Sequence, residues 1–475
     1  MEPSLQDGLP ASVRSQLDDI ARAVGPAYLV GGVLRECLRR EPVSNDLNLL
    51  LCRPLPDCYQ RLESAGFQEL SLDRKSNSLL LSLKRQENPK TIAIASCRGH
   101  QSGVLCGPEA IVEDLRHRDL TVNAMAWLWP DGPLLDPFNG MEDLDNNTIR
   151  LVEGRTTLEG DPLRALRFLR FAIQLPGRPV ARDLEACCQT SLSGEDPERL
   201  RAEMDRLLSL PLRKCHSQRL IRALFGSPLG ESLLPELARL KETFTAYPCA
   251  PQAKMNPERQ NFYDYTLSMM LEIAAPDKQG EISRLDLRWA GLLHLVGMDR
   301  DCKKKGELSP HLLKPGEASL VEIEEILTRL QFSRRRQRRV LSLIQALESQ
   351  FPQTERGLKR LMEQNAPVES LIRMVKARQS ARPDVDDKEH QRINGEFHRA
   401  MRRCLALRRS QNSLKIQDLN LSGGDIIELV RRRPGPWLSQ VQNQLLTWVV
   451  EEPRRNQRDL LSRRVLDWMV EQPDF

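Results

Sequence analysis

The sequence contains few aromatic residues: Phe, Trp and Tyr make up 5% of its 475 residues. Platforms that stack unpaired bases on aromatic side chains therefore cannot be abundant. Long apolar stretches are missing as well, since no run reaches the roughly 18 residues that a membrane-spanning helix needs. The first residues also lack a basic region followed by an apolar core, which is the pattern of a secretory signal. We expect a cytoplasmic protein.

The cysteines lack the spacing of a disulfide or zinc framework. There are 11 of them with no Cys-x-x-Cys, and Cys187 and Cys188 are adjacent, which places them poorly to bridge each other. Mostly buried thiols in a reducing compartment are the simplest interpretation. The net charge of +5 is small, so it permits a nucleic-acid partner without requiring one. The sequence does not indicate an oligomeric state.

A chain of this length is too long for one hydrophobic core, so we expect two to four domains. The first hundred residues mix helices with a small sheet. Expected helices cover 11–24, 33–40 and 57–64, and expected strands cover 28–30, 46–51, 78–84 and 91–96. Farther along the chain, amphipathic helical patterns dominate. The predicted fold class is α+β: a head with a small mixed sheet, followed by an extended all-helical remainder.

The head contains a pattern suited to phosphate. A short buried strand ends at Gly31-Gly32, where the backbone can approach a phosphate closely, and a helix begins directly afterwards. Asp46 opens the next strand, and Asn48 shares its face because residues at i and i+2 of a strand project to the same side. Two carboxylates in this arrangement would hold Mg²⁺ against a nucleoside triphosphate, but one of the pair is an amide.

Two polar segments follow. Residues 112–126 are interpreted as a turn feeding a helix, with Thr121 as a possible cap. Farther on, Asp161 suits the N-cap of a helix and Pro162 its first position. Arg164 and Arg167 then share one helix face because they are three residues apart.

Together these segments resemble one family. The sequence resembles class II tRNA nucleotidyltransferases and bacterial poly(A) polymerases in several motifs, which occur in the family's order over roughly 28–210 and 415–462. They are Leu29-Val-Gly-Gly-x-x-Arg35, Asp46 opening a strand, Arg118-Asp-x-Thr-x-Asn-Ala-Met125, Asp136-Pro-Phe-x-Gly140, Asp161-Pro-Leu-Arg-x-Leu-Arg167, Glu198-Arg-x-x-x-Glu203, Leu421-Ser-Gly-Gly-Asp-Ile426 and Asn456-Gln-Arg-Asp-Leu-Leu461. The resemblance implies a nucleotidyltransferase head at 1–150, a helical nucleotide-binding neck at 151–212, a helical body at 213–380, and a linker with an RNA-binding helical tail at 381–475.

The resemblance also implies roles for individual residues. Asp46 would be catalytic, and Asp46 with residue 48 would ligate Mg²⁺. The triphosphate, the ribose and the base of the incoming CTP or ATP would be bound by nine residues: Gly31, Gly32, Arg35, Arg118, Asp119, Asn123, Asp161, Arg164 and Arg167. Asp161 and Arg164 would read the base edge, because a carboxylate offers acceptors and a guanidinium offers donors.

The sequence departs from the family pattern at metal-binding positions. Asn48 replaces the second metal-binding Asp, and Ala93 stands where the family usually places an acid. Elsewhere, His117 replaces an Arg and Gly160 replaces an acid. The body resembles a metal-dependent phosphohydrolase domain, but only His294 remains of its ligand pattern, so we expect a helical fold without a metal. Because neutral groups hold Mg²⁺ weakly, we expect a weak or lost metal site in the head.

Three functions remain open at this point. The first is a template-independent RNA nucleotidyltransferase that adds CMP, AMP or both to RNA 3′ ends, with the tRNA 3′ end as the expected partner. The second is a catalytically impaired relative that binds tRNA or another structured RNA without extending it, and the third is a nucleotide-sensing regulator. Arginine clusters form either a phosphate-tracking surface or solvated helix faces; they lie at 334–339, Arg399, Arg402, Arg403, Arg408, Arg409 and 431–433. No residue separates CC-addition, A-addition and polyadenylation.

Overall fold

The structure is a computed structural model of the 475-residue chain. It describes residues 5–43, 46–67, 70–73, 78–83, 90–97, 108–175, 177–212, 214–242, 244–246, 259–273, 282–298, 315–347, 351–352, 354, 357–358, 368–382, 385–412 and 416–471. The chain divides into two compact units, one of Met1–Pro310 with Pro315–Leu341 and the other of His311–Lys314 with Ser342–Phe475. The finer boundaries at 150, 212 and 380 remain predictions.

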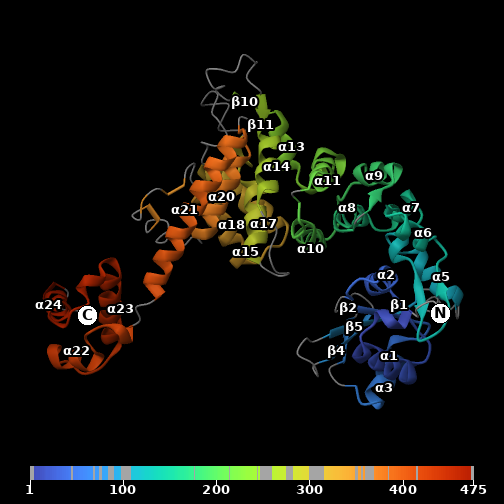
Figure 1. Ribbon diagram of the computed structural model, residues 1–475, viewed down its shortest axis with the longest axis horizontal. Coiled ribbons are helices and arrows are strands. Elements are labelled where there is room, and N and C mark those ends of the chain that lie inside the picture. Colours follow the sequence, from blue (N-terminus) through green and yellow to red (C-terminus); the bar gives the residue numbers. More distant parts are fainter. Residues whose placement is uncertain are drawn as a thin grey trace. The chain divides into compact units, whose positions relative to one another are not determined.

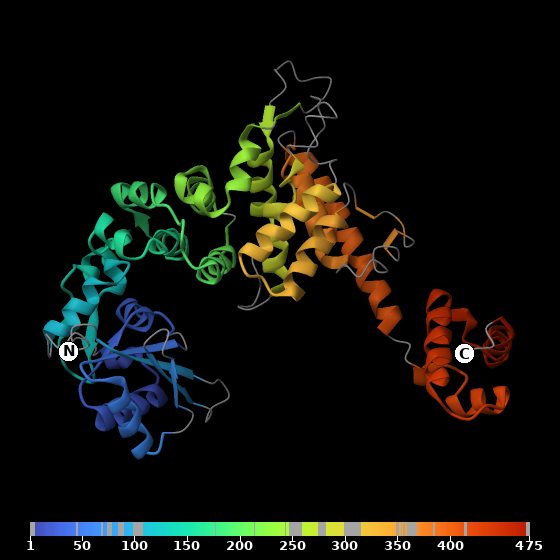
Figure 2. The same ribbon diagram turned by 180° about the vertical axis from the view of Figure 1, so that it is seen from behind.

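The head is built on a seven-stranded mixed sheet (Figures 1 and 2). Its strand order is β3-β4-β5-β2-β1-β6-β7, and only the β2–β5 pair is parallel. The strands are β1 (Ala27–Val30), β2 (Asp46–Leu51), β3 (Leu70–Asp73), β4 (Ser78–Leu83), β5 (Lys90–Ser96), β6 (Ala126–Leu128) and β7 (Leu134–Leu135). The expected strands at 28–30, 46–51, 78–84 and 91–96 are confirmed to within one residue.

Short helices surround this sheet. They are η1 (Leu5–Gly8), α1 (Ala11–Val24), α2 (Gly32–Arg39), α3 (Leu55–Ser64), α5 (Pro108–Arg116) and the 3₁₀ turn η2 (Thr121–Asn123). The apolar stripe of α1 is buried, as its spacing predicts, and α1 packs against α3. Leu115 and Ile111 of α5 lie in one core cluster with residues of β1 and β2, namely Tyr28, Val30 and Leu50. One face of β1 and β2 is thereby buried under α5.

The helix expected after Thr121 is wrong. The helix α5 precedes that residue, and Thr121 begins the 3₁₀ turn η2, which leads into β6. The hydroxyl of Thr121 donates to Asp143 at 2.7 Å and caps no helix. Residues 126–128 form strand β6, which pairs with β1, and its residues Ala126 and Trp127 are buried.

Helices dominate the remainder of the first unit. They are α6 (Gly140–Asp145), α7 (Arg155–Gly160), α8 (Arg164–Gln174), α9 (Ala181–Cys188), α10 (Pro197–Leu208), α11 (Cys215–Gly226), α12 (Pro228–Leu233), α13 (Pro235–Arg239), η3 (Leu240–Glu242), α14 (Phe262–Glu272), α15 (Ile282–Leu293), α17 (Glu317–Arg329) and α18 (Arg334–Gln345), which crosses the division between the units. Two small sheets interrupt them, β8 (Thr148–Ile149) with β9 (Arg178–Pro179) and β10 (Phe244–Ala246) with β11 (Arg259–Asn261).

A buried ionic cluster joins three of these helices. Arg336 of α18 donates to Asp205 of α10 at 2.6 Å and to Asp286 of α15 at 2.8 Å. Asp205 also accepts from the indole of Trp289 at 2.7 Å. Burial raises the pKa of Asp286, although the neighbouring arginines oppose the shift. The neck helix α10 is therefore fixed to the body by charge as well as by packing.

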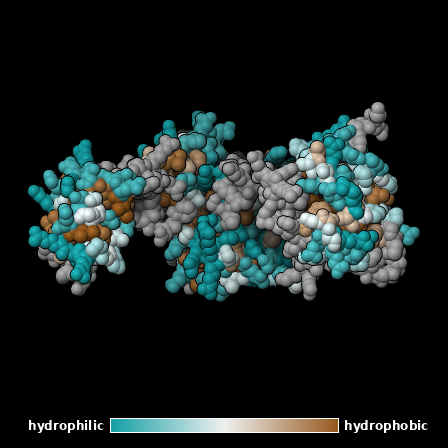
Figure 3. Space-filling view, turned by 90° about the horizontal axis from the view of Figure 1, so that it is seen from below, coloured by the Kyte–Doolittle hydropathy of each residue, from teal (hydrophilic) through white to brown (hydrophobic). Residues whose placement is uncertain are grey.

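The regular secondary structure of the second unit is helical in the described residues. It contains α20 (Val368–Ser380), α21 (Asp387–Asn412), η5 (Ile416–Asp418), α22 (Gly423–Val430), α23 (Pro436–Glu451), η6 (Pro453–Arg455) and α24 (Arg458–Glu471). Ser422 and Asp425 form a capping box at the start of α22, and Ile426, Val441 and Leu461 lie in the core that α22, α23 and α24 share. The face in Figure 3 is mostly hydrophilic where residues are described. No helix in the described ranges is long and apolar enough to cross a membrane.

Candidate functional site

The turn between β1 and α2 forms the floor of the candidate site. Gly31 has φ +78°, a conformation that a residue with a side chain adopts only with strain. A Cβ atom at Gly31 would lie 3.8 Å from the amide nitrogen of Asn48 and 4.0 Å from Arg118. Gly32 begins the eight-residue helix α2, whose N-terminus favours an anion. The local geometry is suited to phosphate.

The proposed metal position lies beside this turn. Asp46 begins β2, and its side chain falls outside the described part of the structure; Asn48 is exposed and pairs with Val30 of β1. On the other side, Asn48 is the register partner of Ala93 on β5. The strand register thus places Ala93 directly beside Asn48.

These residues do not fit a site for two Mg²⁺ ions. One carboxylate, one amide and one methyl group supply a single charge, whereas Mg²⁺ is held by one or two carboxylates together with substrate phosphates. The set does fit one ion that keeps phosphate and water ligands. Among the residues with described side chains, no group of three or more His, Cys, Asp and Glu could hold a metal.

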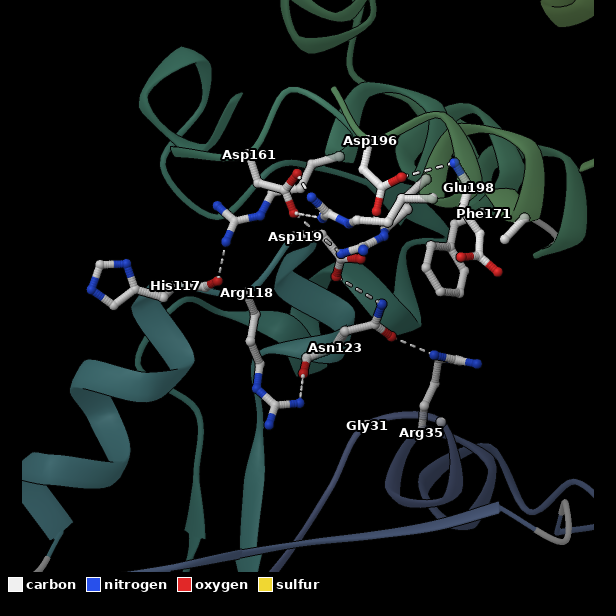
Figure 4. A pocket seen from close by; sticks show the side chains of 15 residues that line it. Gly31, Arg35, His117, Arg118, Asp119, Asn123, Asp161, Phe171, Asp196 and Glu198 are labelled. Carbon is white, nitrogen blue, oxygen red and sulfur yellow. Dashed lines mark hydrogen bonds and ion pairs between the residues drawn. The ribbon is translucent and has the colours of Figure 1, made fainter. Parts of the chain in front are cut away.

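A network of hydrogen bonds in the head forms another side of the site (Figure 4). Asn123 donates to Asp119 at 3.1 Å and accepts a hydrogen bond from Arg35. The main-chain oxygen of Asn123 also accepts from Arg118 at 3.2 Å. Arg35 is 6% exposed, and burial lowers its pKa, while Glu36 and Asp119 oppose that shift. These hydrogen bonds hold the buried guanidinium of Arg35 near the N-terminus of α2.

The neck supplies the opposite wall. Asp161 lies between α7 and α8, and Arg199 of α10 donates to both of its carboxylate oxygens, at 3.1 and 3.2 Å. Arg167 lies 3.8 Å from the same carboxylate. The expectation that Asp161 caps a helix is wrong: α8 begins at Arg164 with Leu163 before it, and Arg199 takes up the carboxylate of Asp161.

Arg164 is buried in this wall. Its guanidinium donates to the main-chain oxygens of Thr157 at 2.7 Å and of His117 at 2.6 Å, and the residue is 8% exposed. It therefore ties the neck to the head segment that carries Arg118 and Asp119.

All nine residues predicted to bind the nucleotide line one open cavity of about 920 Å³. They are Gly31, Gly32, Arg35, Arg118, Asp119, Asn123, Asp161, Arg164 and Arg167. A cavity of this size lies within the range of small-molecule sites. Its arginines and the N-terminus of α2 suit a polyanion, and its carboxylates offer hydrogen-bond acceptors.

The cavity has further lining residues, which are His117, Phe171, Asp196, Glu198, Arg199 and Ala202. Glu198 and Arg199 belong to a motif identified in the sequence, but neither was predicted to be a site residue. Phe171 follows Arg167 by four positions on α8, so helical spacing could have found it. The contact of Arg199 with Asp161 joins residues 38 positions apart, which no local pattern indicates.

The predicted phosphohydrolase-like region is packed as a core. Tyr265, Leu295 and Met298 are buried, and His294 is bound through Nδ1 to the main-chain oxygen of Gly291 at 2.8 Å. The ring centroids of Tyr265 and His294 lie 6.0 Å apart. In the part of this region that the structure describes, these side chains pack in the interior of the protein.

The arginine clusters divide by environment. In 334–339, Arg334, Arg335 and Arg338 are exposed, whereas Arg336 and Arg339 contact Asp286. In the second unit, Arg399, Arg402 and Arg403 of α21 and the arginines at 431–433 are exposed, and the side chains of Arg408 and Arg409 lie outside the described part. Each unit therefore exposes positive charge that suits phosphate.

Two protein-family models match the chain. The model of a poly A polymerase head domain matches residues 27–150, and the model of a putative tRNA nucleotidyltransferase domain 2 matches residues 316–465. The first match covers the sheet, the Gly31–Gly32 turn and the Asn123 hydrogen-bond chain.

Relatives and solved structures agree with these matches. The chain is 31% identical over 279 residues to the multifunctional CCA protein of Aromatoleum aromaticum and 29% identical over 277 residues to that of an Azoarcus species, covering 57% of this chain in both cases. The chain spans 62% and 61% of the length of those relatives. The fold is similar to a CCA-adding enzyme of Bacillus stearothermophilus in complex with CTP, with a TM-score of 0.57, 18% identity and coverage of 98% of this chain and 99% of the other. A Thermotoga maritima CCA-adding enzyme complexed with tRNA gives 0.54 at 19% identity, with coverage of 98% and 97%.

Proposed function

We propose that this chain is a template-independent RNA nucleotidyltransferase of the tRNA nucleotidyltransferase and poly(A) polymerase type, a proposal supported by the two family models that match residues 27–150 and 316–465. It adds CMP, AMP or both to the 3′ end of an RNA, with tRNA as the main substrate. The observation that carries the proposal is the single cavity lined by all nine predicted nucleotide-binding residues. The relatives named CCA proteins and the CCA-adding enzymes of the same fold support this substrate class.

The head binds and orients the triphosphate. Backbone N–H groups at the Gly31-Gly32 turn and at the N-terminus of α2 donate to phosphate oxygens, and Arg118 and Arg35 add positive charge beside them. Attack of an RNA 3′-hydroxyl on the α-phosphate would release pyrophosphate, whose added charge these groups stabilise. Asp119 and Asn123 hold Arg35 in place through their hydrogen bonds.

Asp46 and the amide oxygen of Asn48 would hold one Mg²⁺ that arrives with the triphosphate. When bound, this ion supplies charge neutralisation at the phosphates and lowers the pKa of a coordinated hydroxyl. The absence of carboxylates at positions 48 and 93 predicts that nucleotide transfer is slow and that it needs a high concentration of Mg²⁺.

The same loss favours a second candidate function, binding of tRNA or another structured RNA without extension. Asn48 and Ala93 lie side by side, so both neutral positions fall on one metal-binding face. The exposed arginines of each unit would then serve RNA binding alone.

Incorporation separates the two functions. The purified protein is incubated with tRNA that lacks its terminal residues, labelled CTP or ATP, and Mg²⁺ or Mn²⁺, beside D46A. The nucleotidyltransferase function predicts incorporation in the wild-type protein that D46A abolishes. No incorporation, together with tight and salt-sensitive binding of tRNA, would support the second function and exclude the first.

A further inference from the structure

Two cysteines of the head contact each other at the ends of the parallel strand pair. Cys52 follows β2, Cys97 follows β5, and the two lie 45 positions apart in the sequence. The thiol of Cys97 donates a hydrogen bond to the sulfur of Cys52, with 3.5 Å between the two Sγ atoms. Their spacing along the chain gives no sign of this contact, because the pairing of two strands creates it.

The backbone at this point suits a disulfide. Leu51 and Ser96 are register partners, and the main-chain N–H of Cys97 donates to the oxygen of Leu51 at 2.8 Å, so the ladder extends to the two cysteines. Neighbouring strands lie about 4.8 Å apart, within the Cα···Cα range of about 4.4–6.8 Å that disulfides span. Since an S–S bond is about 2.05 Å long, the two sulfurs need to approach by about 1.5 Å.

The two thiols differ in their access to solvent. Cys97 is fully buried in the core cluster of Tyr28, Leu50 and Leu115, whereas Cys52 is half-buried and packs against the edge of that cluster. A reagent in solution therefore reaches Cys52 first. An accessible thiol beside a buried second thiol is the arrangement of an attacking and a resolving cysteine.

We propose that Cys52 and Cys97 form a redox couple, which a small-molecule disulfide oxidises to an intramolecular disulfide between β2 and β5. The Cys52 thiolate attacks one sulfur of the reagent and expels the other half as a thiol. The Cys97 thiolate then attacks the Cys52 sulfur of the mixed disulfide and expels the second half. The protein loses two electrons and two protons, and the reagent gains both as it becomes two thiols.

The bond stabilises the head. It closes a loop that contains α3, β3, β4 and β5, and a cross-link of this kind limits the freedom of the unfolded chain. The oxidised protein therefore unfolds at a higher temperature than the reduced protein. This inference goes beyond the proposed function and does not depend on it, since neither nucleotide nor RNA takes part.

The test is oxidation of the full-length protein by glutathione disulfide, compared with the same protein in dithiothreitol. Peptide mass spectrometry without reduction should identify a linked pair of peptides that carry Cys52 and Cys97. Thermal unfolding followed by circular dichroism should give the oxidised protein a melting temperature about 3 °C or more above that of the reduced protein. Dithiothreitol should reverse both effects.

Variants assign the bond to its two cysteines. C52A and C97A should each abolish the linked pair and the difference in melting temperature between the two conditions. C52A, at the half-buried position, keeps the test decisive if C97A fails to fold. C58A is the matched control, because it removes a buried thiol of the same segment, in α3, and it should keep both effects.

Three results would overturn the inference. They are the absence of the linked pair in the oxidised wild-type protein, a glutathione that stays attached to Cys52, and equal melting temperatures of the oxidised and reduced proteins. An absence of nucleotide incorporation would contradict the proposed function and leave this result intact.

Discussion

Asn48 of β2 and Ala93 of β5 are register partners in the one parallel strand pair of the head sheet. Residues paired in this way project to the same face, so an amide and a methyl group lie together beside the Gly31 turn. Of the three positions 46, 48 and 93, only position 46 therefore carries a carboxylate.

The first prediction restores that charge. N48D combined with A93E should tighten binding of Mn²⁺ or Mg²⁺ in the presence of CTP by about tenfold or more, because each added carboxylate is a charged oxygen ligand. Calorimetric titration of the metal, with the wild-type protein as the reference, measures the change. Unchanged metal affinity in the double variant would show that this face does not bind the ion.

The second prediction concerns the chain from Asp119 through Asn123 to Arg35. N123A should weaken ATP binding by about tenfold, because a buried guanidinium loses an acceptor, and such a loss costs about 1–3 kcal/mol. N146A, at an exposed position after α6, should leave the affinity unchanged. Equal ATP affinities of N123A and the wild-type protein would show that Arg35 does not contribute to nucleotide binding.

The third prediction concerns the ionic cluster of the body. R336M should destabilise the first unit by about 3–5 kcal/mol, because it leaves Asp205 and Asp286 without their shared partner. Thermal unfolding followed by circular dichroism measures the loss. R335M, at an exposed neighbouring position, should change the melting temperature little. A melting temperature for R336M equal to that of R335M would contradict the structural role of the cluster.

The fourth prediction concerns acid stability of the second unit. Hydrogen bonds from Arg392 lower the pKa of Glu389 from 4.5 to about 2, and those from Arg382 add to the shift. Since the folded-state pKa is the lower one, the stabilisation is fully present above about pH 4.5 and is lost as pH falls towards 2.

E389Q should therefore reduce stability at pH 6 and converge with wild type near pH 2. Urea unfolding at several pH values, followed by circular dichroism, measures this difference. A difference between the two proteins that stays constant from pH 6 to pH 2 would show that Glu389 makes no such contribution. Exposure of the pair to solvent keeps the effect modest.

Much of the fold could be predicted because its signals are local. The apolar runs of β1 and β2 and the apolar stripe of α1 depend on neighbouring residues, and β2 was expected at the bounds that the structure has. The start of α8 and the conformation after Thr121 could not be predicted, since tertiary partners decide both. Thr121 binds Asp143, and Asp161 binds Arg199, so neither side chain is left to cap a helix.

The candidate site shows the same division. The motifs identified nine residues that converge on one cavity, but they did not distinguish an exposed guanidinium from a buried one. The environments of Arg164 and Arg199 depend on the packing of α7, α8 and α10, and only the structure shows that Arg164 is buried and Arg199 exposed.

The central claim is that the cavity between head and neck binds the nucleoside triphosphate. Calorimetric titration of CTP in EDTA, into wild-type protein and R118M, tests this claim most directly because it requires neither RNA nor metal. One CTP should bind per chain, and R118M should weaken binding by about tenfold or more through loss of a charge-assisted contact. Equal CTP affinity of the two proteins, or no binding by the wild-type protein, would contradict the claim.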